Sequence, residues 1–200
     1  MMCLTIAHWK WRLRSLGFGS VIGRIKIIAP SRIRLGTKVF IDDFAVLNGS
    51  GSKNSYLTIE DGVVVREFAV IEAHKGSIEL GRNVFIGHHC VLYGQGGLAI
   101  GQDTMVAAGT LMVASSHNFD TLDQPYREQG EVSNGTKIGK NCWIGARCTI
   151  LDGVELGDNV IVAAGSVVNK SWPKDLLIGG TPAKPIKQYD HKSKQWLPAK

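Results

Sequence analysis

The chain has 200 residues, a net charge of +6 and 44% hydrophobic residues. This length suits one domain, and the sequence has no run of eighteen apolar residues that would cross a membrane. The short apolar run at the N-terminus precedes the basic residues, the reverse of the order in a secretory signal, so we expect a cytoplasmic protein.

Basic residues gather at the N-terminus, where residues 1–41 hold eight Lys or Arg and no Asp or Glu. We predict that residues 1–20 form a short basic helical segment that caps the open end of the domain behind it. An alternative is that this segment holds the protein weakly at the inner membrane surface, near anionic lipid or a lipid-linked glycan. No pattern of stacked aromatic and basic residues supports nucleic-acid binding.

From residue 35 onward, an aliphatic residue returns every six positions. The positions are Leu35, Ile41, Leu47, Ile59, Val65, Ile71, Leu80, Ile86, Leu92, Ile100, Val106, Met112, Ile138, Ile144, Ile150, Leu156, Val162 and Val168. A period of six fits neither a helix nor a hairpin, and it predicts a chain that makes a short strand, turns a corner and repeats. Each interruption of the period falls after a third hexad, so three hexads make one triangular coil. The sequence predicts an all-β parallel solenoid of six coils over residues 21–175, with a partial seventh coil at Val21 and Ile27.

The residue four places after each aliphatic position is small everywhere except at Lys75 and Trp172. Small residues allow successive corners to stack closely. Three cysteines occupy this position, so we interpret Cys90, Cys142 and Cys148 as packed core thiols. The absence of any CxxC spacing argues against a zinc site or a disulfide framework.

Two stretches interrupt the regular coils conspicuously. The first is a polar Gly/Ser/Asn loop over residues 48–58, and the second is a long loop over residues 118–137 that opens at His117. A long loop leaving a regular scaffold is a usual place for function. The tail over residues 176–200 is basic and punctuated by prolines, and we expect its polar end to be disordered.

The hexads, with the motifs SSHNF, NCWIGARC and GGTPAKPIK, resemble the hexapeptide-repeat acyltransferases over roughly residues 20–188. The most similar members are sugar and polysaccharide O-acetyltransferases of the maltose, galactoside, colanic-acid and lipopolysaccharide type. The resemblance implies a left-handed parallel β-helix, acetyl-CoA as the co-substrate and no metal. It also implies a homotrimer with active sites between neighbouring subunits.

His117 is the best candidate for a catalytic base. It lies where a rigid coil meets the long loop, and an imidazole can accept a hydroxyl proton at neutral pH. The resemblance assigns this role to the histidine of SSHNF. Glu155 stands five places after its third aliphatic position, as His117 does, so stacking predicts that it orients the imidazole. His89 matches a family position that is often Asn and contacts the acceptor or the thioester oxygen; a donor there would stabilise an oxyanion.

The resemblance also assigns residues to the cofactor. Trp143, Gly145 and Ala146 match the family residues that flank the pantetheine arm. The small side chains of Ala163 and Ala164 suit close approach of that arm. The cations expected at the CoA phosphates are Lys170, Lys184 and Lys187.

The favoured function is acetyl transfer to a sugar hydroxyl in the assembly of surface polysaccharide or lipopolysaccharide. Acetylation of an amino-sugar or an antibiotic is an alternative that the acceptor loop does not separate. The same solenoid hosts metal-dependent carbonic anhydrases, but these need a second histidine five places on, where this chain has Leu122. A non-catalytic binding solenoid would leave the Trp143 and lysine motifs unexplained.

Overall fold

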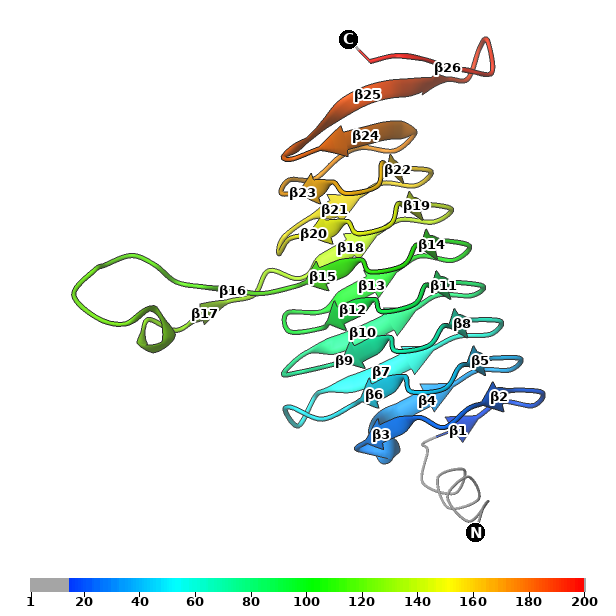
Figure 1. Ribbon diagram of the computed structural model, residues 1–200, viewed down its shortest axis with the longest axis vertical. Helices are drawn as coiled ribbons and strands as arrows, with labels where there is room; N and C mark the ends of the chain where they lie inside the picture. The colour runs from blue at the N-terminus through cyan, green and yellow to red at the C-terminus, as the bar shows by residue number, and fades with distance from the viewer. Residues whose placement is uncertain (1–14, 200) are drawn as a thin grey trace.

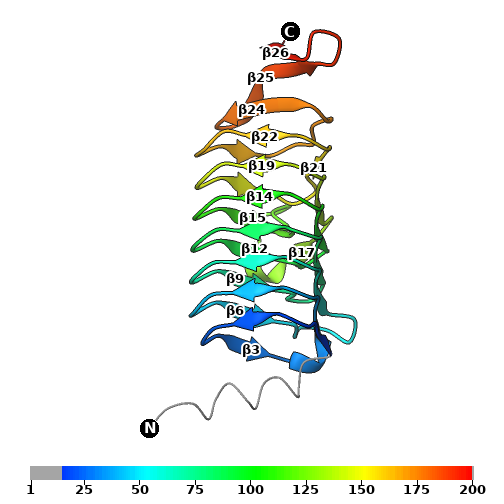
Figure 2. The ribbon, with the colours of Figure 1, turned by 90° about the vertical axis from the view of Figure 1, so that its right-hand side faces the viewer.

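The computed structural model describes residues 15–199, which form a triangular column of stacked coils (Figure 1, Figure 2). The predicted left-handed parallel β-helix is confirmed. Residues 1–14, which hold most of the predicted basic cap and its membrane-surface alternative, lie outside the described residues. Within the described part, no helix is long and apolar enough to cross a membrane.

Three parallel sheets form the sides of the column. Sheet A contains β1 (Ser15–Leu16), β4 (Ile33–Leu35), β7 (Tyr56–Ile59), β10 (Ser77–Leu80), β13 (Leu98–Ile100), β18 (Thr136–Ile138) and β21 (Glu155–Leu156). Sheet B contains β2 (Val21–Ile22), β5 (Phe40–Ile41), β8 (Val64–Val65), β11 (Phe85–Ile86), β14 (Met105–Val106), β19 (Trp143–Ile144), β22 (Ile161–Val162), β24 (Leu176–Gly180), β25 (Ala183–Asp190) and β26 (Gln195–Pro198). Sheet C contains β3 (Lys26–Ile28), β6 (Val46–Asn48), β9 (Val70–Glu72), β12 (Val91–Tyr93), β15 (Leu111–Val113), β20 (Thr149–Ile150) and β23 (Val167–Val168).

The remaining elements lie at one edge of the column. The strands β16 (Ser116–His117) and β17 (Glu131–Val132) form a separate antiparallel pair. The short 3-10 helices are η1 (Pro30–Arg32) and η2 (Tyr126–Glu128). From residue 35 onward, all the interruptions of the hexads fall at the corner between sheets C and A, as predicted.

The predicted hexad residues stack one above another inside the column. On sheet B, Ile41 pairs with Val65, Val65 with Ile86, and Ile86 with Val106, and each of these side chains is fully buried. Burying an aliphatic side chain contributes roughly 1.5–3 kcal/mol. The periodic residues therefore supply the main stabilisation of the coils.

The small corner residues pack inside the column as predicted. Cys90, Cys142 and Cys148 are 0–1% exposed, and burial raises the pKa of each thiol. The buried hydroxyls of Thr104 and Thr110 at the same position donate to carbonyls of the next coil. Polar groups at this position are thus satisfied by backbone partners.

The column contains one more full coil than the sequence predicted. The first coil begins with β1 at Ser15, before the predicted boundary at residue 21. The inward residue of β2 is Ile22, which pairs with Ile41, whereas Val21 points outward and is 56% exposed. The prediction for Val21 was wrong because the first corner from β2 to β3 is one residue shorter than a hexad.

The C-terminal tail is ordered up to Pro198, contrary to the expected disorder. After β24, the chain turns back twice and adds β25 and β26 to sheet B as antiparallel strands. The rings of Tyr189 and Trp196 meet edge to face across these strands, with centroids 5.4 Å apart. The tail therefore continues sheet B beyond the last coil (Figure 1).

The outer faces of the sheets differ in polarity. Outward residues on sheet A are Arg34, Thr58, Glu79, Ala99, Lys137 and Glu155. Outward residues on sheet B are Val21, Phe40, Val64, Phe85, Met105, Trp143, Ile161 and Leu177. Sheet B thus carries a continuous apolar ladder along its outer face, which we call the sheet B ladder.

Candidate active site

His117 lies at the base of a long hairpin that projects from the column (Figure 1). The hairpin leaves after β15 and returns at β18, and its base is the β16–β17 pair, in which His117 stands directly opposite Glu131. The imidazole is exposed. The structure therefore fixes the backbone of His117 and leaves its side chain accessible, as a base that receives a substrate proton requires.

Two residues of the column hold Glu131 in place. The amide of Gln95, which is 7% exposed, donates to the Glu131 carboxylate at 2.6 Å, and the Lys75 ammonium donates to it at 3.0 Å. These hydrogen bonds, with the nearby His117 as a smaller cause, hold the pKa of the Glu131 carboxyl below its usual value. A carboxylate that is ionised at neutral pH thus lies across the strand pair from the predicted base.

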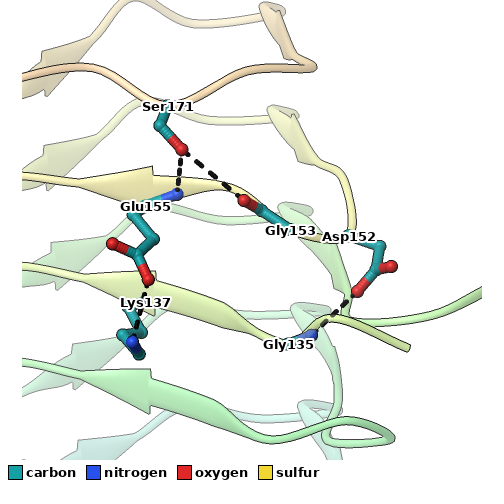
Figure 3. A network of polar contacts seen from close by, with 6 residues as sticks. All are labelled: Gly135, Lys137, Asp152, Gly153, Glu155 and Ser171. Atoms are coloured by element: carbon teal, nitrogen blue, oxygen red, sulfur yellow. Dashed lines mark hydrogen bonds and ion pairs between the residues drawn. The ribbon is translucent and has the colours of Figure 1, made fainter.

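The stacking predicted between Glu155 and His117 does not occur within the chain. Glu155 lies on β21 in register with Lys137, and its carboxylate accepts a hydrogen bond from the Lys137 ammonium at 2.8 Å (Figure 3). That bond raises the pKa of Lys137. The spacing argument was wrong because the chain leaves the column after β15, so Lys137 takes the stacking position that His117 would have held.

His89 lies at the corner between sheets B and C, at the end of a short stack of rings. Its ring stacks on Phe68 at 4.9 Å, and Phe68 stacks on Phe44 at 5.2 Å. In the next coil the equivalent corner residue is Gly109, which has no side chain to continue the stack of rings. His89 thus has one face packed on Phe68. Its neighbour His88 contacts Glu67 at 2.6 Å and belongs to a separate ion-pair cluster.

The cofactor residues predicted from two distant motifs share one face. Trp143 pairs with Ile161, Ile161 with Leu177, and Leu177 with Lys187, in four neighbouring strands of sheet B. Lys184 stands opposite Gly179 on the same strand pair. Since strands lie about 4.8 Å apart, roughly 14 Å separate the backbones at Trp143 and Lys187. An extended ligand lying on this face would reach both an exposed indole and two exposed ammonium groups.

The small residues predicted beside the cofactor form the upper part of the corner between sheets B and C. A side chain on Gly145 would come within 2.5 Å of the backbone nitrogen of Ala164 in the next coil. Ala146 and Ala163 follow β19 and β22 at the same corner. The stacked positions of this corner beside Trp143 are therefore occupied by small residues, and the next residue, Arg147, is exposed.

Lys170 lies apart from the other two predicted lysines. It follows β23, and its ammonium lies 4.6 Å from the centroid of the Trp172 ring. Trp172 lines an open hollow of about 510 Å³ on sheet A, together with Glu155 and Lys137. The structure thus places Lys170 on a different side of the column from Trp143 and Lys187.

Within one chain, the structure does not bring His117 together with Trp143. The hairpin leaves the corner between sheets C and A, whereas Trp143 lies on sheet B, the side opposite that corner (Figure 1). Among the described residues, no group of three or more His, Cys, Asp or Glu could hold a metal ion. The arrangement offers an accessible base on one side and an elongated ligand face on another.

Sequence reasoning missed Glu131, Gln95 and Lys75 as parts of the site. One signal was available, because Lys75 breaks the rule that a small residue follows each aliphatic position by four. The structure gives the reason: the Lys75 side chain points out of the column toward the hairpin and is 60% exposed. Gln95 gave no comparable signal in the sequence.

Comparisons with known proteins agree with the coil architecture. Residues 135–170 match the family "Bacterial transferase hexapeptide (six repeats)", and residues 78–112 match "Hexapeptide repeat of succinyl-transferase". A solved structure of an AntD variant, an N-acyltransferase from Bacillus cereus in complex with dTDP-4-amino-4,6-dideoxyglucose and coenzyme A, shares the fold with a TM-score of 0.64. It is 22% identical, and the match covers 94% of this chain and 89% of that one.

Two curated Escherichia coli (strain K12) relatives have names that specify O-acetyl transfer. The putative lipopolysaccharide biosynthesis O-acetyl transferase WbbJ is 30% identical over 61% of this chain and 66% of its own length. Galactoside O-acetyltransferase is 27% identical over 72% of this chain and 70% of its own length. The chain thus spans about two thirds of the length of these relatives. The hexad matches, the named relatives and the shared coils show that the chain belongs to the hexapeptide-repeat superfamily of acyltransferases.

Proposed function

We propose that the chain is an acetyl-CoA-dependent O-acetyltransferase that modifies a sugar hydroxyl of a surface polysaccharide, lipopolysaccharide or lipid-linked glycan. The observation that carries the proposal is the shared outer face of Trp143 and Lys187 on sheet B, with Lys184 beside them. This face suits a long cofactor with an anionic end, because lysine ammonium groups bind phosphates as point charges. The names of the two Escherichia coli relatives favour a hydroxyl acceptor over an amine.

The proposed reaction is a single displacement at the thioester. His117 removes the proton of the acceptor hydroxyl while the hydroxyl oxygen attacks the thioester carbonyl carbon. The resulting oxyanion is stabilised by donors near the corner, with His89 as the candidate side chain. The carbon–sulfur bond then breaks, the acetyl ester is formed, and the protonated imidazole returns its proton to the CoA thiolate.

We further propose that the active enzyme is a homotrimer in which His117 of one chain faces the sheet B cofactor site of a neighbour. Two observations support this arrangement: His117 and Trp143 lie on different sides of one column, and sheet B exposes a continuous apolar ladder. Large contiguous apolar patches on a soluble chain commonly mark interfaces. A closed ring would bury the same ladder on every subunit.

The first test is calorimetric titration with acetyl-CoA. We expect micromolar binding that weakens at least about tenfold in Lys184→Ala/Lys187→Ala, because two charge-assisted phosphate contacts are lost. The matched control is Lys192→Ala/Lys194→Ala, which removes two lysines from the turn between β25 and β26 and should bind as wild type does. Absence of binding at millimolar acetyl-CoA would contradict the proposal.

The second test measures release of CoA thiol in the presence of sugar acceptors. His117→Ala should reduce the rate by about 10²–10⁴-fold, the usual contribution of a general base, while acetyl-CoA still binds. An amino-sugar is included as a separate acceptor, and an amide product formed faster than any ester would favour the N-acetyltransferase alternative. Acetyl-CoA binding without thiol release for any acceptor would indicate a binding solenoid.

A further inference from the structure

We propose that Glu131 is the positioning residue of the active site, which orients the His117 imidazole and stabilises its protonated form during acetyl transfer. This inference rests on the proposed function, because it assigns a partner to the proposed base. In this role Glu131 replaces Glu155, whose carboxylate is hydrogen-bonded to Lys137 instead.

The first support is the backbone pairing of the hairpin base. His117 and Glu131 are directly opposite in the antiparallel β16–β17 pair, so their side chains project from the same face. Directly opposite residues in such a pair have Cβ atoms about 4.5–5.5 Å apart. A glutamate side chain is long enough to reach an imidazole nitrogen from that position.

The second support is that the carboxylate is held from the opposite side. Gln95 donates to Oε2 of Glu131 at 2.6 Å, and the Lys75 ammonium donates to the same atom at 3.0 Å. No hydrogen bond to Oε1 of Glu131 is among the polar contacts of the described residues. One carboxylate oxygen is therefore anchored on the column, and the other is available to the imidazole.

The charge arrangement favours this role. Lys75 and His117 are the two titratable groups that act on Glu131, and the hydrogen bonds from Gln95 and Lys75 hold its pKa below the usual value. The carboxylate is thus negative throughout the neutral range. A negative charge next to an imidazole favours the imidazolium that forms when the acceptor hydroxyl gives up its proton.

A purely structural role for Glu131 is separable from a positioning role, because other contacts hold the hairpin. Where the hairpin rejoins the column, Asp152 accepts a hydrogen bond from the backbone N–H of Gly135 at 3.0 Å (Figure 3). It accepts another from the backbone N–H of Asn134 at 2.9 Å. The backbone N–H of Asn118 donates to the Gly130 carbonyl at 3.1 Å beside the strand pair. Removing only the charge of Glu131 should leave this framework in place.

The decisive variant is Glu131→Gln, which keeps an oxygen acceptor for Gln95 and Lys75 but removes the charge. We expect kcat for thiol release to fall about 10- to 100-fold with KM for acetyl-CoA within about twofold, because a base loses orientation and charge stabilisation without losing its cofactor site. The acidic limb of the kcat/KM pH profile should move to lower pH, because the charge that favours the imidazolium is gone. Glu131→Asp should recover part of kcat.

The matched control is Glu128→Gln, which removes an equal charge from the same hairpin at a residue whose ion pair among residues 15–199 is with the neighbouring Arg127. The control should keep wild-type kcat and the wild-type pH profile. Melting temperatures of all variants are compared first. If Glu131→Gln melts below wild type, its pH profile is measured at a temperature at which both proteins remain folded.

Two results would overturn the inference, and they differ from failure of the proposed function. If His117→Ala abolishes turnover while Glu131→Gln behaves as Glu128→Gln does, the base stands and Glu131 has no positioning role. An unmoved pH limb in a stable Glu131→Gln with reduced kcat would show a structural role only. Wild-type protein that releases no thiol, or His117→Ala that is fully active, would overturn both proposals together.

Discussion

Asp175 is the one charged residue in the described part of the chain that is almost fully buried, with 6% of its surface exposed. Its carboxylate accepts hydrogen bonds from the Asn159 amide at 2.8 Å and from the His191 ring at 2.9 Å. These contacts, that with His191 first, lower the pKa of Asp175 below its ordinary value of 3.8. They also connect the last coil to the turn between β25 and β26.

The lowered pKa of Asp175 makes a prediction about stability and pH. The ionised carboxylate contributes its full stabilisation above the unfolded-state value of about 3.8 and loses it as the pH falls through the lower folded-state value. Asp175→Asn should therefore reduce the free energy of unfolding by roughly 1–2 kcal/mol at pH 7, and the difference should shrink below about pH 4. Urea unfolding at several pH values measures this.

The control for this prediction is Asp120→Asn, on the exposed hairpin, which should leave stability unchanged at every pH. A difference between Asp175→Asn and wild type that persists undiminished to pH 3 would show that the carboxylate charge is not the source of the stabilisation.

The turns at the corner between sheets B and C repeat one backbone conformation. Phe44, Phe68, His89 and Arg147 all have positive φ there, from 55° to 64°, and Gly109 and Gly165 have 71°. At Gly87 and Gly145, two places before His89 and Arg147, an added Cβ would meet the backbone of the next coil, so stacking restricts the size of these two residues. One turn thus contains a position limited by backbone angle and another limited by space.

These two limits can be measured separately. Gly145→Ala should lower the free energy of unfolding by about 2–3 kcal/mol, because its Cβ would lie 2.5 Å from a backbone nitrogen of the next coil. Gly165→Asn should cost less than about 1 kcal/mol, because nothing lies within 4 Å and Asn adopts left-handed angles readily. Thermal and urea unfolding compare the two. Equal losses would contradict the argument.

The coils could be predicted from the sequence because their pattern is local. Each inward residue, such as Ile86 or Ile144, repeats within a window of six positions, and burial enforces it in every coil. The hairpin base could not be predicted in the same way. Glu131 meets Gln95 and Lys75, which lie 36 and 56 residues away in the chain, and no period links them. The stacking prediction for Glu155 failed because it assumed that the coil continued after β15, where the hairpin leaves the column.

At the scale of the whole molecule, sheet A has a polar outer face and sheet B an apolar one. The sheet B ladder includes Phe40, Met105 and Trp143, which are 37%, 50% and 51% exposed in the single chain. A ladder of this length is a predicted association surface. The residues proposed to bind the cofactor, from Trp143 to Lys187, occupy the C-terminal end of the same face, so the proposed assembly and cofactor binding would use one side of the column.

We expect charges on the sheet B ladder to separate the subunits. Phe40→Asp/Phe85→Asp should shift the protein from three times the chain mass to the chain mass in sedimentation equilibrium, because charged groups in an apolar interface are not solvated. Both residues point away from the core, so the coils should keep their circular dichroism spectrum. Thr58→Asp, on the outer face of sheet A, is the control and should remain trimeric. A wild-type protein that sediments as one chain would contradict the proposed trimer.

The hairpin leaves the stack of coils undisturbed. Leu98 pairs with Thr136 across the insertion, and Leu111 pairs with Thr149, in the same register as coils joined by short turns. At the base of the hairpin, Ser116 pairs with Val132, so its two ends are held one strand spacing apart. Closing a flexible segment costs only about 0.6 kcal/mol more for each doubling of its length. A hairpin of another length or sequence could therefore stand on the same coils, and under the proposed function it would present a different surface to the acceptor.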